Sequence, residues 1–225
     1  MSKTLSVGII MDGNRRWAKG KNLSVPEGHK AGSETLITLL KEYSFLKKEH
    51  GIEHYIFYAF STENWNRSKE EVVGFMVSLK KGLSVLKKEL TKIENPPKVV
   101  VLGDRSRLEE GIQNEISKIE EETKGNKGTI AIALSYGGRD EIVRAVRKGG
   151  EVSEEGISKA LDTAGIPDPD IIIRTGGEKR LSNFLLWQAA YSELFFLDTL
   201  WPDFTKESLI ECIKEYNARE RRHGV

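Results

Sequence analysis

Two stretches of this sequence combine charged side chains with glycine in a way that suits phosphate binding. The first, residues 12–16, reads Asp-Gly-Asn-Arg-Arg and follows an apolar run over residues 5–11. Where a strand leads into a helix, outward-pointing N–H groups and the helix dipole favour an anion, and Gly13 would let it approach closely. Asp12 beside a bound diphosphate would be a natural ligand for Mg²⁺, which prefers one or two carboxylates together with phosphate oxygens. The alternative interpretation is an N-cap aspartate followed by two solvated arginines.

The second stretch, residues 174–183, places Arg174, Arg180, a lysine, two glycines and hydroxyl side chains directly after an apolar run. This composition predicts a second anion site, although a glycine turn with surface charges has a similar composition. The sequence contains neither the spacing of a P-loop nor the G-x-G-x-x-G spacing of a dinucleotide-binding turn. Two anion sites in one protein predict two phosphorylated substrates.

The elements that must position these residues alternate between strand and helix. Six short runs rich in Ile, Val and aromatic residues are predicted strands, with helical stretches between most of them. The alternation predicts an α/β fold, a single domain over residues 1–225 with a central, mostly parallel six-stranded sheet flanked by helices. The predicted strands are residues 5–11, 55–60, 99–103, 130–135, 171–174 and 194–197, and the predicted helices are residues 28–48, 68–90, 107–122, 140–148 and 206–222.

Polar residues follow four of the predicted strands, beginning at Met11, Ser61, Tyr136 and Arg174. In open parallel sheets, ligands bind in the crevice beyond the carboxyl ends of the strands. We therefore expect these four segments to form one site at that edge. A capping box, Ser68 with a glutamate three residues later, is predicted to begin the second helix close to this edge.

The composition limits the classes of function. A formal net charge of +1 gives no global field that would favour a nucleic-acid partner. The single cysteine, Cys212, excludes an internal disulfide and a zinc site built on cysteines. Because the sequence has no run of about eighteen apolar residues, which a spanning helix needs, a soluble cytoplasmic protein is expected.

Several motifs, taken in order, resemble those of one family. They are residues 9–18, 28–32, 58–67, 136–139, 173–178, 180–188 and 201–204. Over essentially its whole length the sequence resembles the cis-prenyltransferases, the undecaprenyl diphosphate synthase family. The resemblance implies a Mg²⁺-dependent homodimer that condenses isopentenyl diphosphate with an allylic prenyl diphosphate. It also implies a hydrophobic tunnel for the growing chain, whose release would bring the protein into peripheral contact with a membrane.

The resemblance implies roles by position. Asp12 would carry Mg²⁺ to the leaving diphosphate, Asn64 would accept a proton, and Glu193 would be a second metal-linked carboxylate. The allylic diphosphate site would comprise Gly13, Asn14, Arg15, Arg16, Trp17 and His29. The segment closing over the reacting ends would comprise Ser61, Thr62, Glu63, Asn64, Trp65 and Arg67, and the isopentenyl diphosphate site Arg174, Arg180, Leu181 and Ser182. Arg222 and Gly224 would reach into the neighbouring subunit's site.

One departure from the family pattern concerns the allylic diphosphate. The family usually has an arginine four residues before the histidine of its second motif, whereas this chain has Val25. Arg15, Lys19 or Lys21 could compensate.

Two questions stay open at the level of sequence. A non-catalytic accessory subunit of a heteromeric enzyme is the alternative function, although both terminal motifs are present. Product length and the preferred allylic starter are not predicted. The candidates for tunnel lining are Val73, Phe75, Met76 and Leu79.

Overall fold

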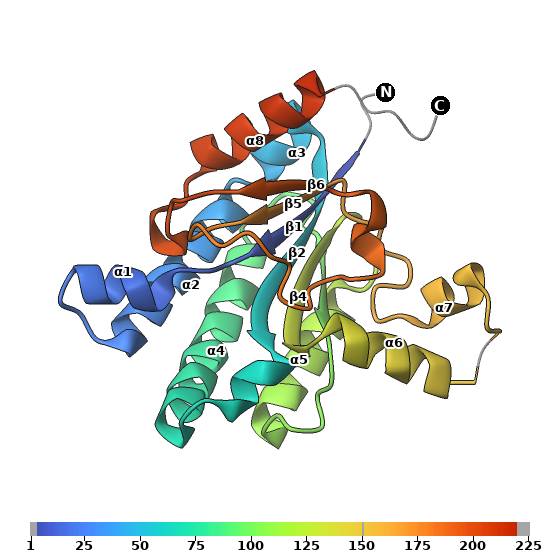
Figure 1. Cartoon of the computed structure of the whole chain (residues 1–225), viewed down its shortest axis with the longest axis horizontal. Coiled ribbons are helices and arrows are strands. Elements are labelled where there is room, and N and C mark those ends of the chain that lie inside the picture. The colour runs from blue at the N-terminus through green and yellow to red at the C-terminus, as the bar shows by residue number, and fades with distance from the viewer. Residues whose placement is uncertain (1–3, 150, 220–225) are drawn as a thin grey trace.

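The six strands found among the described residues form one parallel sheet (Figure 1). The computed structural model describes residues 4–149 and 151–219. The strand order is β3-β4-β2-β1-β5-β6, and each pair of neighbours is parallel. The strands are β1 (Leu5–Ile10), β2 (Ile52–Ser61), β3 (Lys98–Leu102), β4 (Thr129–Tyr136), β5 (Ile171–Arg174) and β6 (Glu193–Phe196). The predicted fold class is confirmed, and the sheet is wholly rather than mostly parallel.

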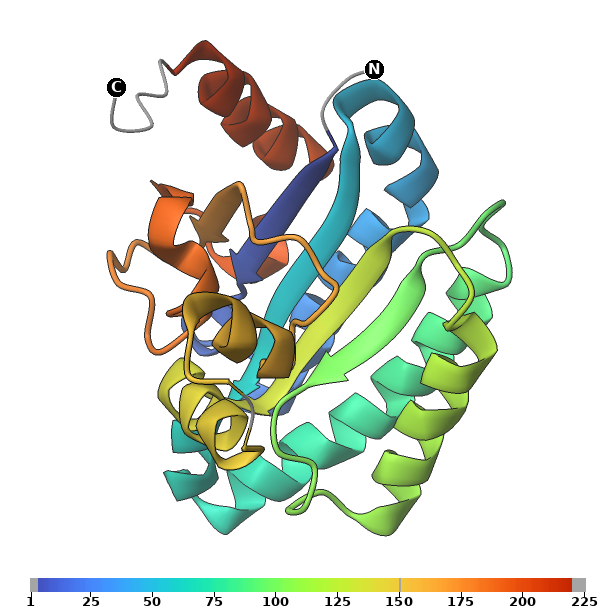
Figure 2. The ribbon, with the colours of Figure 1, turned by 90° about the vertical axis from the view of Figure 1, so that its right-hand side faces the viewer.

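Helices and loops cover both faces of the sheet. The α-helices are α1 (Asn14–Gly20), α2 (Val25–Lys41), α3 (Tyr43–His50), α4 (Lys69–Leu90), α5 (Glu110–Thr123), α6 (Gly138–Arg147), α7 (Glu154–Ala160) and α8 (Lys206–Ala218). Three 3₁₀ turns complete the described elements: η1 (Thr62–Asn66), η2 (Gln188–Tyr191) and η3 (Trp201–Asp203). Figure 2 shows α2 and α4 behind the sheet, with α6 and α7 in front of it.

The core is divided by the sheet into two clusters. Val7 and Ile9 of β1 pack into the larger cluster with residues of α2, α4 and α5, whereas Ile10 packs into the smaller cluster with Phe184 and Leu185. Every residue of β1, β4 and β5 is buried. This explains why the runs lack strict alternation, since a parallel strand covered on both faces needs apolar residues on both.

The predicted helix over residues 28–48 is wrong in one respect, because it is two helices. Glu42 has φ −86° and ψ 1°, and its backbone N–H donates to the carbonyls of Leu39 and Leu40 at the end of α2. The turn brings Tyr43 and Leu46 of α3 into the core. Neither glycine nor proline marks this break in the sequence.

The structure also differs from the sequence prediction at the start of α4 and at the end of α8. The Ser68 hydroxyl accepts the N–H of Glu71 at 3.3 Å, but the carboxylate of Glu71 pairs with Arg15 at 3.3 Å, so half of the predicted capping box forms. Helix α8 ends at Ala218, and residues 220–222 of the predicted helix lie outside the described residues.

Candidate active site

The site begins where β1 ends. Asp12 is held by Thr175, whose hydroxyl accepts the Asp12 N–H at 3.0 Å and donates to the Asp12 carbonyl at 2.7 Å. Gly13 follows with φ 114°, a left-handed conformation, and a Cβ there would lie 2.9 Å from Leu200. Glycine is therefore required at this turn for two reasons, backbone conformation and space. The turn leads directly into α1, so the carboxylate of Asp12 lies beside a helix N-terminus.

An ion pair joins the two predicted anion stretches. Nη2 of Arg174 donates to Oδ2 of Asp12 at 2.7 Å, and Arg16 lies 3.4 Å from the other carboxylate oxygen. Nη1 of Arg174 donates to the Arg180 carbonyl at 2.6 Å and to the Ser182 hydroxyl at 2.7 Å. Arg174 is only 4% exposed, and its Nε has no partner within the chain. A buried guanidinium with a free donor suits an incoming anion.

Helices α1 and α2 pack closely around Asn14. A Cβ at Gly28 would lie 2.4 Å from the Asn14 carbonyl oxygen, and one at Gly32 would lie 2.3 Å from Asn14 Oδ1. Trp201 closes this contact, since its Nε1 donates to the Gly32 carbonyl at 2.8 Å. Asn14 Oδ1 is buried and has no hydrogen-bond partner within the chain. Such an orphaned acceptor beside a cavity is a group that a ligand or water can satisfy.

The segment after β2 forms the opposite side of the site. Its Asn64 Oδ1 accepts the Ser61 N–H at 3.1 Å, which fixes the amide at the start of η1. Trp65 is anchored to Ser135 by a hydrogen bond of 2.9 Å from its Nε1, and the guanidinium of Arg107 lies 4.4 Å from its ring centroid. The residues of η1 are thus positioned by β4 and by the loop after β3.

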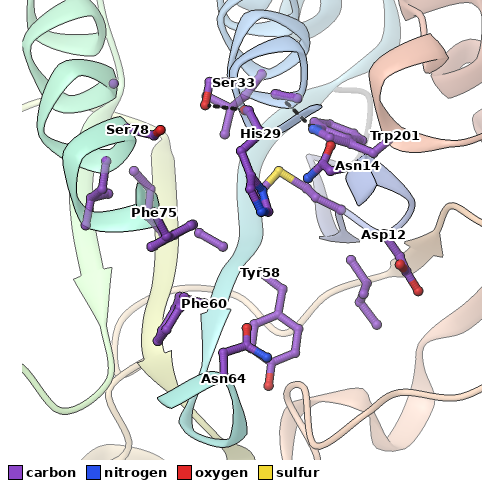
Figure 3. A pocket seen from close by; sticks show the side chains of 18 of the residues that line it. Asp12, Asn14, His29, Ser33, Tyr58, Phe60, Asn64, Phe75, Ser78 and Trp201 are labelled. Carbon is purple, nitrogen blue, oxygen red and sulfur yellow. Dashed lines mark hydrogen bonds between the residues drawn. The ribbon is translucent and has the colours of Figure 1, made fainter. Parts of the chain in front are cut away.

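A cavity of about 330 Å³ extends from these polar residues between α2 and α4 (Figure 3). Figure 3 shows Asp12 and Asn14 on one side of it and Phe75 and Ser78 on the other. Phe75 and Leu86 both line the cavity from α4, and eleven residues of helix span about 16 Å. The apolar part of its wall includes Leu36, Ile37, Phe75, Leu79, Leu83, Leu86 and Ile132.

His29 stands at the junction of the polar and apolar parts of the cavity. Its ring packs edge-on against Phe75, with 6.2 Å between centroids. Burial lowers the pKa of His29 below 6.5, and the nearby charge of Arg67 lowers it further. Arg15 acts in the same direction, while Glu71 opposes it. At neutral pH the imidazole is therefore uncharged, and positive charge at this end of the cavity comes from the guanidinium groups.

The comparisons with known proteins agree on one family. The family model described as "Putative undecaprenyl diphosphate synthase" matches residues 10–224. The chain belongs to this prenyltransferase family. Isoprenyl transferases of Treponema denticola and Rhizobium meliloti are each 46% identical to it, over 97% of this chain and 96% and 91% of their own. The protein is therefore an enzyme that transfers prenyl groups.

A solved structure from the family shows the same fold. Lavandulyl diphosphate synthase from Lavandula x intermedia, in complex with dimethylallyl diphosphate, has a TM-score of 0.90 and 35% identity, covering 98% of both chains. This similarity extends over the sheet and both helical layers. Among the described residues, no helix is both long and apolar enough to cross a membrane.

Eight of the residues that the family resemblance singled out gather at this cavity. The cavity is lined by Asp12, Asn14, His29, Ser61, Asn64, Arg67, Arg174 and Ser182. Of the remainder, Trp17 donates to Asp203 at 2.7 Å and Arg180 pairs with Glu178 at 2.6 Å. Leu181 packs against the smaller core cluster. Arg222 and Gly224 lie outside the described residues.

Glu193 lies far from the other predicted metal ligand. It is the first residue of β6 and pairs in register with Ile171, at the start of β5, whereas the Asp12 partner Arg174 is at the other end of β5. Three residues of strand span about 10 Å. Glu193 accepts instead a hydrogen bond of 2.6 Å from Arg219. Within one chain the structure does not bring Glu193 to Asp12, and its role at a metal stays a prediction.

The candidates for tunnel lining on α4 separate clearly. Phe75 and Leu79 line the cavity, whereas Val73 is 53% exposed and points to solvent. Met76 is buried in the larger core cluster and does not line the cavity. Gly82, which lines the cavity one turn beyond Leu79, carries no sequence signal other than its small size.

The structure also limits which residue can replace the arginine absent at position 25. Lys21 lies 4.1 Å from the Trp17 ring centroid and 4.0 Å from Asp203. The charge of Arg15 acts on both His29 and Arg67. Arg15 is therefore the better placed of these two cations.

Proposed function

We propose that this chain catalyses the Mg²⁺-dependent, stepwise addition of isopentenyl diphosphate to an allylic diphosphate, forming each new double bond in cis geometry and yielding a long-chain polyprenyl diphosphate. The observation that carries the proposal is a single cavity with a cationic, polar end and a long apolar part. Two substrates that each combine a diphosphate with a hydrocarbon match this distribution of polarity. The dimethylallyl diphosphate in the lavandulyl relative is a ligand of this class.

Mg²⁺ is the proposed cofactor, and Asp12 would hold it. The Asp12 side chain is partly exposed, lines the cavity and offers a carboxylate, which matches the preference of Mg²⁺ for one or two carboxylates with phosphate oxygens and waters. In the part of the chain that the structure describes, no three His, Cys, Asp or Glu side chains gather around one point. The ion would act as a Lewis acid for charge on the leaving diphosphate.

The chain's own residues would separate the charges that develop in the reaction. Breaking the allylic C–O bond leaves negative charge on the allylic diphosphate, which Arg15 and Arg16 would stabilise, and positive charge on carbon. The apolar part of the cavity would keep water from that carbon. The isopentenyl double bond then forms the new C–C bond. Loss of a proton toward Asn64, and finally to the released diphosphate, leaves the new double bond.

The two anion sites would set geometry as well as affinity. Ser61, Asn64 and Arg67 would close over the reacting ends, while Arg174 and Ser182 would hold isopentenyl diphosphate. Holding two reactants in one orientation supplies much of the rate enhancement in such a reaction. The reaction needs no nucleophilic side chain.

Assembly and location are also proposed on the family resemblance. The chain would form a homodimer in which Arg222 and Gly224 of each subunit complete the other subunit's site. It would work in the cytoplasm, with peripheral contact to a membrane when the apolar product leaves. The comparisons give no support to the alternative of a non-catalytic accessory subunit.

The test is incorporation of radiolabelled isopentenyl diphosphate by the purified chain, with Mg²⁺ and allylic starters of increasing length. A ladder of lengthening prenyl diphosphates, abolished by EDTA and by Asp12→Ala, is expected. Removal of the diphosphate with a phosphatase, followed by chromatography of the alcohols against cis and trans standards, would establish the double-bond geometry. Failure to incorporate with every starter would refute catalysis by this chain alone and would revive the accessory-subunit alternative.

A further inference from the structure

Asn183 connects three segments of the site, although the proposed mechanism does not use its side chain. Its Nδ2 donates to Glu63 Oε1 at 2.9 Å, and its Oδ1 accepts the Arg139 N–H at 2.9 Å. Its carbonyl accepts the Gly138 N–H at 2.7 Å. The residue thereby ties the loop after β5 to η1 and to the start of α6.

The loop that carries Asn183 needs such support because its backbone is strained. Ser182, Asn183 and Leu185 have φ values of 49°, 66° and 46°. Non-glycine residues rarely adopt this left-handed region, and asparagine tolerates it better than most. The loop keeps this shape only while outside contacts hold it.

Space for the contact with η1 is provided by Gly137. A Cβ at this position would lie 2.7 Å from Asn183 Nδ2 and 2.7 Å from Thr62 Oγ1. Any larger residue would push the loop and η1 apart. Glycine at 137 therefore permits the approach that the hydrogen bond between Asn183 and Glu63 requires.

The two ends of this hydrogen bond adjoin residues that line the cavity. Ser182, next to Asn183, accepts a hydrogen bond of 2.7 Å from Arg174, and Asn64 follows Glu63. Burial would raise the pKa of Glu63, but hydrogen bonds from its own N–H and from Asn183 outweigh it and lower the pKa. Glu63 is thus an ionised acceptor at neutral pH.

We infer that Asn183 is a positioning residue whose amide ties Glu63 on η1 to the loop carrying Ser182, and so fixes the isopentenyl diphosphate subsite relative to the segment that closes over the reacting carbon atoms. The inference rests on the proposed function for the identity of the ligand. The geometry that supports it is the set of hydrogen bonds of Asn183 and the close approach at Gly137.

The pair can be tested by exchanging its two functional groups. Asn183→Asp places two carboxylates against each other and removes the donor. Glu63→Gln is the second single variant of the cycle, and its amide oxygen still accepts from Asn183. In the double variant the amide at position 63 donates to the carboxylate at position 183, whose other oxygen accepts the Arg139 N–H. The double variant has the same net charge as the unaltered chain.

Calorimetry in the presence of Mg²⁺ measures two dissociation constants for each variant: the Kd of isopentenyl diphosphate and the Kd of an allylic diphosphate. Asn183→Asp should raise the Kd of isopentenyl diphosphate about tenfold, which is the effect expected from losing a hydrogen bond to a charged group. Its effect on the allylic diphosphate should be much smaller. The double variant should recover most of the affinity for isopentenyl diphosphate that Asn183→Asp loses, and Glu63→Gln is measured to complete the double-mutant cycle. The KM for isopentenyl diphosphate should follow the same order.

Two results would overturn the inference. One is a double variant that binds isopentenyl diphosphate as weakly as Asn183→Asp does, and the other is an equal rise in the Kd of both diphosphates in Asn183→Asp. Should Asn183→Asp fail to fold, Glu63→Ala removes the same hydrogen bond from an exposed position. It should weaken the binding of isopentenyl diphosphate more than that of the allylic diphosphate. If the unaltered chain binds isopentenyl diphosphate but extends no starter, the proposed function fails, while the Kd values still decide the role of Asn183. Absence of any binding would refute both.

Discussion

Arg174 and Asp12 face each other across the two anion sites, with Nη2 of the arginine 2.7 Å from Oδ2 of the aspartate. In the free protein the buried guanidinium is thus neutralised by the residue that is proposed to bind Mg²⁺. A metal ion at Asp12 would compete with Arg174 for the carboxylate. Arg174 would then be free to bind an anion with a group that is already desolvated and oriented.

Replacing Asp12 by asparagine should therefore remove activity without unfolding the protein. The amide oxygen can still accept from Arg174, whose bonds to Arg180 and Ser182 remain. The loss of the metal ligand should lower kcat by about 10³, the scale of a deleted electrostatic stabiliser of the transition state. Steady-state kinetics and a melting curve test this together. A variant that retained a tenth of the activity would show that Asp12 is not the metal ligand.

Gly32→Ala should impair substrate binding, because its methyl group would displace the Asn14 side chain from the position that it now occupies. Gly74→Ala on α4 is the matched control, since a Cβ there meets nothing within 4 Å. The control should keep its activity and gain up to about 1 kcal/mol in free energy of unfolding, the difference in helix propensity between alanine and glycine. Urea unfolding and the KM of each diphosphate measure the two effects. Equal KM values in both variants would contradict the role given to the packing around Asn14.

Product length should depend on Gly82. A Cβ at this position meets nothing within 4 Å, and the residue lines the cavity one turn beyond Leu79. A leucine at position 82 would occupy the apolar part, so Gly82→Leu should shift products to shorter chains. Chromatography of the labelled products measures the shift, with Val73→Leu on the exposed face as the control. An unchanged distribution in Gly82→Leu would mean that the growing chain does not pass this point.

Stability should depend on pH through His29, whose pKa is lowered by burial and by Arg67. Between this lowered pKa and the unfolded value of about 6.5, the unfolded chain binds a proton that the folded chain does not. The free energy of unfolding must therefore decrease as pH falls through 6.5, with no contribution from His29 at higher pH. His29→Gln should lose less stability between pH 7.5 and 5.5 than the unaltered chain. Parallel pH profiles of the two proteins in chemical denaturation would contradict the shift.

The sequence predicts the sheet well because burial on both faces leaves a clear signal. All six predicted strands form, since runs such as residues 171–174 are apolar at every position but the last. The short helices carry weaker signals. Helix α1 buries only Ala18 and therefore has no apolar stripe, and α7 buries none of its residues. The break at Glu42 depends on packing of α3 that no local residue encodes.

For the site, the sequence predicts residue types better than contacts. The anion stretches around Asp12 and Arg174 meet because β1 and β5 are neighbours, which follows from the strand order and not from any motif. Glu193 is separated from Asp12 because it is the first residue of β6, whereas Asp12 follows the last residue of β1, so the two lie toward opposite ends of the parallel sheet. Asn183 lies within a predicted anion stretch, yet only the folded backbone shows which segments it joins.

The position of β1 has a consequence for how the protein is made. Val7 and Ile9 leave the ribosome before residues 171–174 do, but β1 pairs on one side with β5, and Val7 is matched with Ile171. Until the nascent chain reaches that point, β1 has an unpaired edge, of the kind that promotes association between incomplete chains. The hydrogen bonds of Asp12 also form only after residues 174 and 175 are made, because Arg174 binds its carboxylate and Thr175 binds its backbone N–H. Truncated translation products that contain the whole first anion stretch should therefore be inactive and prone to aggregation, which makes the late arrival of β5 the step at which a chaperone would protect this protein.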